Sequence, residues 1–342
     1  MIETAIILAA GRGSRLKEIT AHRSKAMVPI AGVPMIGRVL ELLRASGISR
    51  FVIVAARSDH ELRAYVTHDP DIRVVTQETA RGSGDALKVC AECVRGSFLV
   101  CACDSLIPVT SLRQIQELYE SSGATAALGV MEVETNVSLS SRSVVRMDRE
   151  KVLDVIEKPR EDERVSDIAG LPLYVFNDGI FAELAALPVS QRGEYELPGV
   201  FRSLLSKGHG VVGCKVSSRE DLTDAGDLLA LTKRYLPDGV RVHESVHIPS
   251  STRLIAPLLI EEGVSIGDNC ILGPSVYLER GCLVLPGACI EQSVLLRGAS
   301  AQGRVSGVVE APRPNVACSQ GPRAEDAEAL DLFMLVSQSV AL

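Results

Sequence analysis

Residues 4–30 read TAIILAAGRGSRLKEITAHRSKAMVPI and contain the stretch that decides the fold. The small and branched apolar run at residues 5–9 predicts a buried β-strand, because such side chains fill both faces of a parallel sheet. The strand leads directly into a turn with two glycines, Gly11 and Gly13, which can adopt positive φ values and let a ligand approach the backbone. Successive backbone N–H groups in such a turn form a concave site for phosphate oxygens.

Basic residues gather around and after this turn, although the whole chain carries a net charge of −7 at pH 7. Between residues 11 and 25 only Glu18 is acidic. A triphosphate needs several preorganised positive groups around it, so this stretch is a candidate phosphate site. A tight turn with solvated charges is the alternative interpretation. The basic residues are Arg12, Arg15, Lys17, Arg23 and Lys25.

The composition is that of a globular protein with more than one domain. The chain has 342 residues, of which 46% are hydrophobic and 23% charged. Aromatic residues make up only 4%, so Val, Ile, Leu and Ala must build the core, which suits parallel sheets and solenoids. The acidic balance argues against nucleic acid or an anionic membrane as the main partner.

Neither a membrane span nor a secretory signal is visible in the sequence. No apolar run is long enough to cross a bilayer, and the N-terminus lacks a basic region ahead of its apolar run. The 9 cysteines show no paired zinc-site spacing and are predicted to be reduced, mostly buried thiols. Together these features predict a cytoplasmic protein.

Strand and helix patterns alternate through the first half, which predicts an α/β domain with a Rossmann-like, mostly parallel sheet. Apolar runs at residues 51–55, 74–75 and 98–102 predict further buried strands. Ligands bind beyond the carboxyl ends of such strands, where the glycine turn and Asp104 both fall. The predicted helices are one from Pro34 to Gly47, one with a Ser58–Glu61 capping box, one carrying Ala86 through Val94, and one capped by Thr110.

A period of six residues begins after the turn at residues 237–239, which marks a domain boundary. Neither a helix nor a simple strand has this period, whereas a left-handed parallel β-helix of hexapeptide repeats does. We predict three parts: an α/β domain at 1–236, a short β-helix of fewer than about three coils at 237–312, and a linker with a C-terminal helix at 313–342. The apolar residues in phase are Leu254, Ile260, Ile266, Leu272, Leu278, Val284, Ile290 and Leu296.

The segments LAAGRGSRL (8–16) and SKAMVPIAGVPMI (24–36) together resemble the N-terminal signature of the sugar-phosphate nucleotidylyltransferases. That signature is Gly-x-Gly-(Thr/Ser)-Arg-(Leu/Met), then Pro-Lys-x-(Leu/Met)-x-Pro-(Ile/Val)-x-Gly-x-Pro, and Ser24 replaces the first proline here. The resemblance implies transfer of a nucleoside monophosphate from a nucleoside triphosphate to a sugar 1-phosphate, with Mg²⁺ as cofactor and pyrophosphate as product. The catalytic residues it implies are Lys25, Arg15 and Asp104, and the nucleotide-binding residues are Leu8, Ala9, Ala10, Gly11, Gly13 and Ser14.

Two later segments also resemble that family. QETARGSGDAL (77–87) is similar to Gln-x-x-x-x-Gly-Thr-(Ala/Gly)-x-Ala-(Leu/Met), which implies that Gln77, Gly82 and Ser83 bind the nucleotide, with the amide reading the base. DLTDAGDL (221–228) is similar to Asp-(Ile/Val)-x-Thr-Pro-x-Asp-Leu. With Asp104, this implies Asp221 as the second magnesium ligand, since hard cations prefer carboxylate oxygens. Cys103 replaces a common glycine, and the tryptophan common two residues before Asp221 is missing.

The acceptor residues implied by the resemblance are less regular. Glu157 and Lys158 match the family's Glu-Lys-Pro, with the lysine facing the substrate phosphate and the glutamate a sugar hydroxyl. Glu196 falls where the family has Glu-x-x-Leu-Thr-Asp, although Pro198 and Gly199 replace the last two residues. Ser143 occupies a position often held by a sugar-contacting glycine. Finally, Pro172 displaces Gly170 by two positions in an otherwise similar segment.

The base and the acceptor stay open at this point. Gln77 with Gly82 favours UTP or dTTP, then CTP, then GTP. One alternative is a cytidylyltransferase acting on a non-sugar phosphate or phosphonate, and another is a catalytically silent regulatory paralogue. The β-helix is expected to be a scaffold that helps form a homo-oligomer. It is not expected to be an acyltransferase, because the last histidine, His247, precedes the regular repeats and no general base follows.

Overall fold

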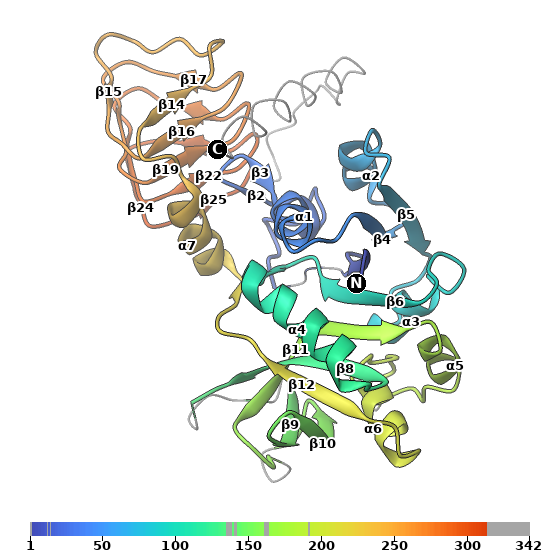
Figure 1. The fold of residues 1–342 in the computed structure, drawn as a ribbon. Helices are drawn as coiled ribbons and strands as arrows, with labels where there is room; N and C mark the ends of the chain where they lie inside the picture. The colour runs from blue at the N-terminus through green and yellow to red at the C-terminus, as the bar shows by residue number, and fades with distance from the viewer. Residues whose placement is uncertain are drawn as a thin grey trace.

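The computed structural model describes residues 2–11, 13, 15–134, 139, 142–160, 164–190 and 192–312. These residues form an α/β part built on a nine-stranded sheet and a stack of short parallel strands beside it (Figure 1). The helix predicted in the last 30 residues lies outside the described part of the chain, as does Ser14 of the glycine turn. Within the described part, no helix is both long and apolar enough to cross a membrane.

Half of the large sheet is parallel, as predicted, and has β1 near its middle. The order begins β5 (Ile72–Gln77), β4 (Arg50–Ala56), β1 (Thr4–Leu8) and β6 (Ser97–Ala102), all running in one direction. Ile6 lies opposite Val52 on one side and Val100 on the other, and it is fully buried. Branched apolar side chains suit this strand because both of its faces are covered by helices.

The second half of the sheet departs from the parallel arrangement. β11 (Ile168–Asn177) lies antiparallel between β6 and β8 (Ala126–Glu132), and β12 (Val211–Lys215) then pairs parallel with β8. The edge is completed by β10 (Lys151–Glu157) and β9 (Ser143–Asp148), both antiparallel. The register of β11 against β8 shifts between Gly170 and Tyr174, where Pro172 has no N–H to donate to the ladder.

Six of the helices among the described residues cover the two faces of the sheet, and α7 (Ala225–Tyr235) lies between the β2 segment (Pro29–Ile30) and the solenoid (Figure 1). One face packs against α1 (Met35–Ala45), α2 (His60–Val66) and α4 (Val109–Ser122). The other packs against α3 (Ser83–Lys88), α5 (Ile180–Ala185) and α6 (Gly199–Ser206). Between β1 and α1 lie the short helix η1 (Lys25–Met27) and the hairpin of β2 (Pro29–Ile30) and β3 (Val33–Pro34).

Three predicted helix boundaries are wrong. The cap of α2 is Asp59, whose carboxylate accepts from Leu62 N, so Ser58 and Glu61 form no capping box. α4 starts at Val109 with Pro108 at its N-cap, and Thr110 lies inside the helix. α3 ends at Lys88, and the residues to Val94 continue as hydrogen-bonded turns that still bury Cys90 and Val94.

The hexapeptide region forms a parallel β-helix of three sheets. Leu254 lies opposite Leu272, and Leu272 opposite Ile290, so a regular coil has 18 residues. The first sheet contains β14 (Val240–Val242), β16 (Leu258–Ile260), β19 (Val276–Leu278), β22 (Val294–Leu295) and β25 (Val309–Glu310). The second sheet contains β15 (Arg253–Leu254), β18 (Ile271–Leu272), β21 (Cys289–Glu291) and β24 (Arg304–Ser306). The third sheet contains β17 (Ser265–Ile266), β20 (Leu283–Val284) and β23 (Ser300–Ala301).

The β-helix is longer than the predicted three coils, because its longest sheet has five strands. Val242 and Ile248 continue the six-residue series upstream and pack against the solenoid core, so the first coil was missed in the sequence. The last coil is shortened, since Val309 lies opposite Val294 and only 15 residues beyond it. His243 donates its backbone N–H to Ile260 and therefore belongs to the first coil, as does the stretch containing His247.

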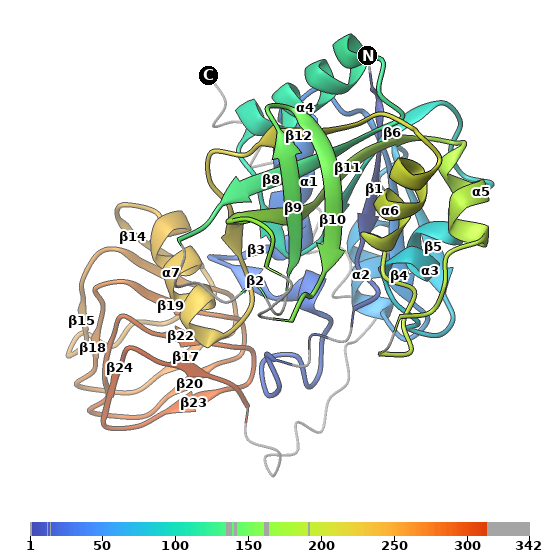
Figure 2. The ribbon, with the colours of Figure 1, turned by 90° about the horizontal axis from the view of Figure 1, so that it is seen from below.

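The solenoid packs its flank against the α/β part (Figure 2). Tyr277, Val294 and Leu296 of the solenoid are buried in the same core cluster as α1, α4 and α7. Leu259 also approaches the tip of the β2–β3 hairpin at Gly32. The apolar flank of the coils is therefore covered within the chain itself.

The cysteines are free thiols, as predicted. All 8 cysteines in the described part of the chain are unpaired, and only Cys93 and Cys289 are more than slightly exposed. Burial raises the pKa of Cys101 to about 12, and that of Cys103 is raised as well. A thiolate at this edge of the sheet is therefore excluded at neutral pH.

Candidate functional site

The glycine turn lies at the carboxyl end of β1 and folds back onto Lys25. Gly13 has φ of +60°, and a Cβ at this position would lie 3.3 Å from the Cβ of Lys25 and the methyl group of Thr20. The backbone N–H of Ala9 donates to Val54 O at 2.8 Å, whereas the backbone N–H groups of Gly11 and Gly13 have no acceptor in the described part of the chain. These two N–H groups are the turn's candidates for binding phosphate oxygens.

Of the predicted cations, Lys25 is fixed and Arg15 is exposed. Lys25 begins η1, and its Nζ donates to Asp104 Oδ2. The side chains of Lys25 and Asp104 are 16% and 30% exposed, so the pair is accessible from the carboxyl edge of the sheet. Arg15 forms no ion pair within the described residues and is free to move toward an anion.

Asp104 and Asp221, the two predicted magnesium ligands, lie on neighbouring chain segments. β7 (Ser105–Leu106) pairs antiparallel with β13 (Glu220–Asp221), which places Asp221 opposite Ser105, the neighbour of Asp104. Leu222 N also donates to Asp104 O at 2.9 Å. The two aspartates thus come from positions 117 residues apart and lie on adjacent backbone segments, and Asp104 is paired with Lys25.

This pair of carboxylates fits Mg²⁺, which is commonly held by one or two carboxylates together with substrate phosphates and water. Asp221 Oδ1 accepts from Ser105 Oγ at 2.6 Å, and its Oδ2 contacts Arg219. No cluster of three or more metal-binding side chains occurs among the residues that the structure describes. A metal at this site would therefore depend on bound phosphate to complete its coordination.

Arg219 was missed by the sequence reasoning. Its side chain is only 8% exposed and forms an ion pair with Asp221. Arg219 stands two residues before Asp221, at the position where the family often has a tryptophan. Arg142 lies close enough for the charges of Arg219 and Asp221 to act on it. Its pKa is lowered, mainly by burial and then by the charge of Arg219. A charged residue in place of the expected tryptophan was the signal available in the sequence.

The predicted nucleotide residues Gln77, Gly82 and Ser83 form one loop at the end of β5. Gln77 is buried, and its Nε2 donates to Asp85 Oδ2 at 2.8 Å and to Gly82 O at 3.2 Å. Gly82 has φ of +106°, and a Cβ there would lie 2.6 Å from the carbonyl oxygen of Tyr195. Only glycine fits both the backbone conformation and this close approach.

The nucleotide loop is bonded to the segment that carries Glu196. Gly84 N donates to Tyr195 O at 2.7 Å, and Tyr195 N donates to Arg81 O at 2.8 Å. Ser83 Oγ accepts from Leu197 N at 3.0 Å. The predicted nucleotide and acceptor residues are thus held together by three hydrogen bonds between two short segments, residues 81–84 and 195–197.

The four predicted acceptor residues also meet in space. Ser143 of β9 lies directly opposite Glu157 of β10, and Lys158 follows with φ of +45°. Lys158 Nζ contacts Glu196 and lies 3.6 Å from Glu157 Oε1. The pKa of Glu157 is raised to about 7, chiefly by burial; the charge of Lys158 lowers it and that of Glu196 raises it.

Gly170 faces Ser143 despite the displacement expected from Pro172. The two residues are paired across β11 and β9, and a Cβ on Gly170 would lie 2.4 Å from Ser143 Oγ. The hydroxyl of Ser143 thus occupies the space that the small residue leaves open. The bulge in β11 places the two extra residues between Gly170 and Tyr174 and so keeps Gly170 at the site.

A comparison with protein families finds a match to the model described as nucleotidyl transferase over residues 4–236. Among curated proteins, the chain is 27% identical over 268 residues to the bifunctional protein GlmU of Methanococcus maripaludis strain S2, covering 78% of this chain and 62% of that protein. The GlmU of Rubrobacter xylanophilus is 29% identical over 321 residues, covering 85% and 65%. The chain thus spans somewhat less than two thirds of the length of these relatives.

Solved structures show the same fold. A UDP-glucose pyrophosphorylase complexed with UDP-glucose superposes with a TM-score of 0.63 at 21% identity, covering 69% of this chain and 98% of that one. The UTP-bound UGPase from Acinetobacter baumannii gives a TM-score of 0.61 at 20% identity, covering 69% and 94%.

Proposed function

Because the chain belongs to the nucleotidyl transferase family, whose model matches residues 4–236, we propose that it transfers a nucleoside monophosphate from a nucleoside triphosphate to a sugar 1-phosphate and releases pyrophosphate. The observation that supports the proposal is the ion pair of Lys25 with Asp104 at the carboxyl edge of the sheet, next to the segment that carries Asp221. UTP or dTTP is the favoured nucleotide, followed by CTP and then GTP. The UDP-glucose and UTP of the structural neighbours agree with this order.

In the proposed reaction, an oxygen of the acceptor phosphate attacks the α-phosphorus of the nucleotide, and the bond from that phosphorus to the pyrophosphate oxygen breaks. Transfer of this kind depends on positioning and charge neutralisation rather than on a covalent intermediate. Lys25 would place its ammonium group at the α-phosphate, where charge develops. The N–H groups of Gly11 and Gly13 would donate to the phosphate chain, with Arg15 and Ser14 beside them.

Asp104 and Asp221 would hold Mg²⁺, which when bound neutralises phosphate charge and orients the phosphate chain. Asp104 is paired with Lys25, and Asp221 with Arg219. Binding of the nucleotide would exchange these ion pairs for phosphate contacts. The lysine and arginine would then be free to bind phosphate oxygens.

Gln77 and Gly82 would read the base, with Leu8, Ala9, Ala10 and Ser83 lining the nucleotide. On the acceptor side, Lys158 would bind the substrate phosphate, and Glu157 and Glu196 would accept hydrogen bonds from hydroxyl groups. Ser143 adds a hydroxyl donor there.

A second candidate keeps the reaction but changes the acceptor to a non-sugar phosphate or phosphonate, with CTP as the nucleotide. It is favoured by the two arginines near Asp221 and by the hydroxyl of Ser143 in the place of a sugar-contacting glycine. A third candidate is a catalytically silent paralogue that binds a nucleotide-sugar. The presence of Lys25, Asp104 and Asp221 favours an active enzyme over this candidate.

The test is a matrix of four nucleoside triphosphates against a panel of phosphate esters, read by pyrophosphate release with and without Mg²⁺. We expect release with UTP or dTTP and a hexose 1-phosphate, and its loss in Lys25→Ala. Lys215→Ala is the matched control, since Lys215 is exposed and pairs only with Glu132. Release with CTP and a phosphonate would select the second candidate, and no release from any pair would leave the silent paralogue.

A further inference from the structure

A buried ion pair joins the solenoid to the segment that carries Lys25. Arg23 Nη1 donates to Glu279 Oε1 at 2.7 Å, and the two side chains are 6% and 7% exposed. Arg23 lies two residues before Lys25, and Glu279 directly follows β19 of the solenoid, 256 positions along the chain. The contact therefore links the two parts of the molecule at the candidate active site.

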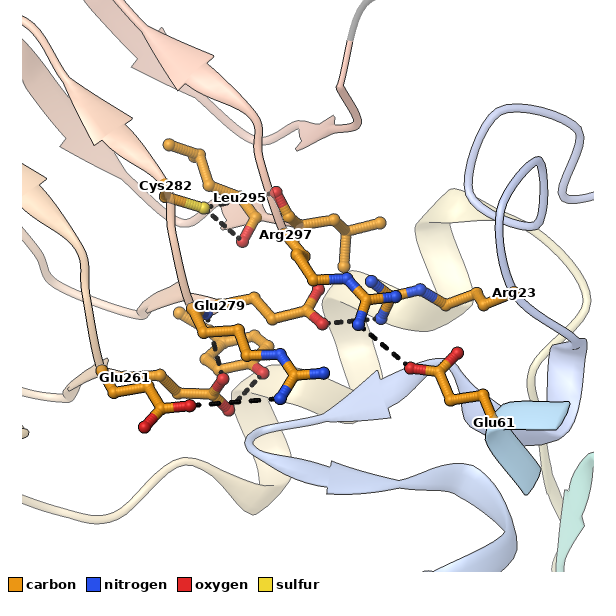
Figure 3. A network of polar contacts seen from close by, with 11 residues as sticks. Arg23, Glu61, Glu261, Glu279, Cys282, Leu295 and Arg297 are labelled. Carbon is orange, nitrogen blue, oxygen red and sulfur yellow. Dashed lines mark hydrogen bonds and ion pairs between the residues drawn. The ribbon is translucent and has the colours of Figure 1, made fainter. Parts of the chain in front are cut away.

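The carboxylate of Glu279 is held in place by the solenoid itself (Figure 3). Its Oε2 accepts from the backbone N–H of Arg297, one coil further on, at 2.7 Å. The guanidinium of Arg297 in turn lies 3.2 Å from Glu61 on α2. Because Oε2 accepts from Arg297 N and the backbone N–H of Glu279 donates to Leu295 O at 2.9 Å, the coils hold Glu279 through contacts that do not involve Arg23.

Arg23 is the anchor of its loop. Leu16 and Ile19 are buried at one end of the loop, and Ala26 and Met27 are buried at the other. Between them Ala21 and His22 are exposed, and no apolar side chain is buried. The Arg23–Glu279 pair is therefore the buried contact that fixes the middle of the loop before Lys25, because a buried guanidinium is stable only beside its carboxylate.

We propose that Glu279 is a positioning residue for the active site: it holds Arg23 and thereby sets the position of Lys25, so that the solenoid completes the catalytic loop. This inference rests on the proposed role of Lys25 in phosphate transfer. A displacement of about 1 Å at a reacting group can cost on the order of a hundredfold in rate, so the position of this loop bears directly on turnover.

The first test is Glu279→Gln, which keeps an oxygen for the N–H of Arg297 and removes the charge that holds Arg23. We expect kcat to fall by about ten- to a hundredfold, with KM for the nucleotide changing by less than about threefold. Hydrogen exchange of the backbone amides in residues 19–27 should rise by about tenfold or more, while that of the coils at residues 258–296 stays unchanged.

The matched control is Arg297→Met. It breaks the contact between the solenoid and α2 at the same interface but leaves the backbone N–H to Glu279 and the Arg23 pair intact. It should leave kcat and the exchange of residues 19–27 as in the unaltered protein. An equal loss in this control would show that general docking of the solenoid matters, and would overturn the role of Glu279.

A double variant, Arg23→Met with Glu279→Gln, removes both charges and leaves no unpaired buried ion. It replaces Glu279→Gln in the test if the single variant does not fold. It should show the same faster exchange and lower kcat. Unchanged exchange of residues 19–27 in the Glu279 variants refutes the inference, and so does faster exchange with unchanged kcat. Absence of pyrophosphate release from the unaltered protein would instead refute the proposed function, and the exchange result would still decide whether Glu279 holds the loop.

Discussion

Three pairs of opposite charge lie at the candidate site. Lys25 is paired with Asp104, Asp221 with Arg219, and Lys158 with Glu196. These pairs keep the partly buried charges compensated before substrate binds. Nucleotide, metal and acceptor can then exchange one partner for another without leaving any ion unpaired.

The metal site gives the first prediction at this scale. Asp104→Asn and Asp221→Asn should each lower kcat by about two to three orders of magnitude, because an amide is a weak ligand for a hard cation. Asp221→Asn should also lower thermal stability, because it leaves the Arg219 side chain, which is 8% exposed, without its carboxylate. Pyrophosphate release at increasing Mg²⁺ measures the effect. Asp268→Asn, an exposed residue of the solenoid, is the control. Full activity of either variant in excess Mg²⁺ would show that the two carboxylates do not hold the metal.

The buried Glu261 gives a prediction on pH. It accepts from Tyr277 Oη at 2.7 Å, and burial raises its pKa from 4.5 to about 7. A raised pKa means that the folded state favours the protonated form, so this contribution to stability is complete below pH 4.5 and is lost as the pH rises through 7.

The unaltered protein loses this contribution as the pH rises, and Glu261→Gln does not. The free energy of unfolding of Glu261→Gln relative to that of the unaltered protein should therefore increase from pH 5 to pH 8, by up to about 3 kcal/mol. Chemical denaturation at the two pH values measures the difference. Glu262→Gln is the matched control, since it removes the same charge from a position that is 44% exposed. A difference between Glu261→Gln and the unaltered protein that does not change with pH would contradict the assignment.

At the scale of elements, the site is assembled where loops from different strands touch. The loop after β5 is bonded to the segment before α6, so the predicted base-reading and acceptor residues share one framework. Gly82 permits this contact, since its φ is +106° and Tyr195 O lies 2.6 Å from where a Cβ would be.

Gly82→Ala should separate the two loops. We expect a loss of about 2–4 kcal/mol of stability, from backbone strain together with the displaced Tyr195, and an increase in KM for both substrates. Gly123→Ala is the control, because Gly123 also has a positive φ but nothing lies within 4 Å of its Cβ position. It should cost only about 1 kcal/mol and leave KM unchanged. Similar effects from the two substitutions would refute the role of the close approach.

At the scale of the whole molecule, the solenoid is a structural partner of the α/β part. The α/β part covers the flank formed by Tyr277, Val294 and Leu296, whereas among the described residues β14 and β25 are the edge strands of the solenoid's longest sheet, and Val240 and Val308 are exposed. We propose, as expected from the sequence, that a second copy of the chain covers solenoid surface and gives a homodimer or higher oligomer.

Light scattering tests this proposal. The full-length protein should have a mass of at least two chains, and a chain truncated near Asp238 should be a monomer of lower stability, because truncation exposes the apolar side chains that face Tyr277 and Leu296. A monomer in both cases would refute association through the solenoid. Acetyl transfer from acetyl-CoA by the full-length protein would refute the expectation that the solenoid is a scaffold only.

The sequence by itself determined the local elements and the chemistry they carry. The apolar run before Gly11 predicted β1, the six-residue period predicted the β-helix, and the residues Lys25, Asp104 and Asp221 were expected to act together. Such features can be predicted because side-chain direction repeats along the backbone with the period of each element, and because a short motif needs only its own neighbours. The caps of α2 and α4 were wrong because several nearby residues can cap a helix equally well.

Only the tertiary structure decided which distant residues became partners. The antiparallel entry of β11 between β6 and β8, the pairing of Arg219 with Asp221, and the contact of Arg23 with Glu279 depend on how strands and coils are ordered in space. Nothing in the sequence around Arg23 indicates that its partner is a carboxylate 256 positions away. Its partner follows from the register and packing of whole elements, since burial without an opposite charge is too unfavourable to persist.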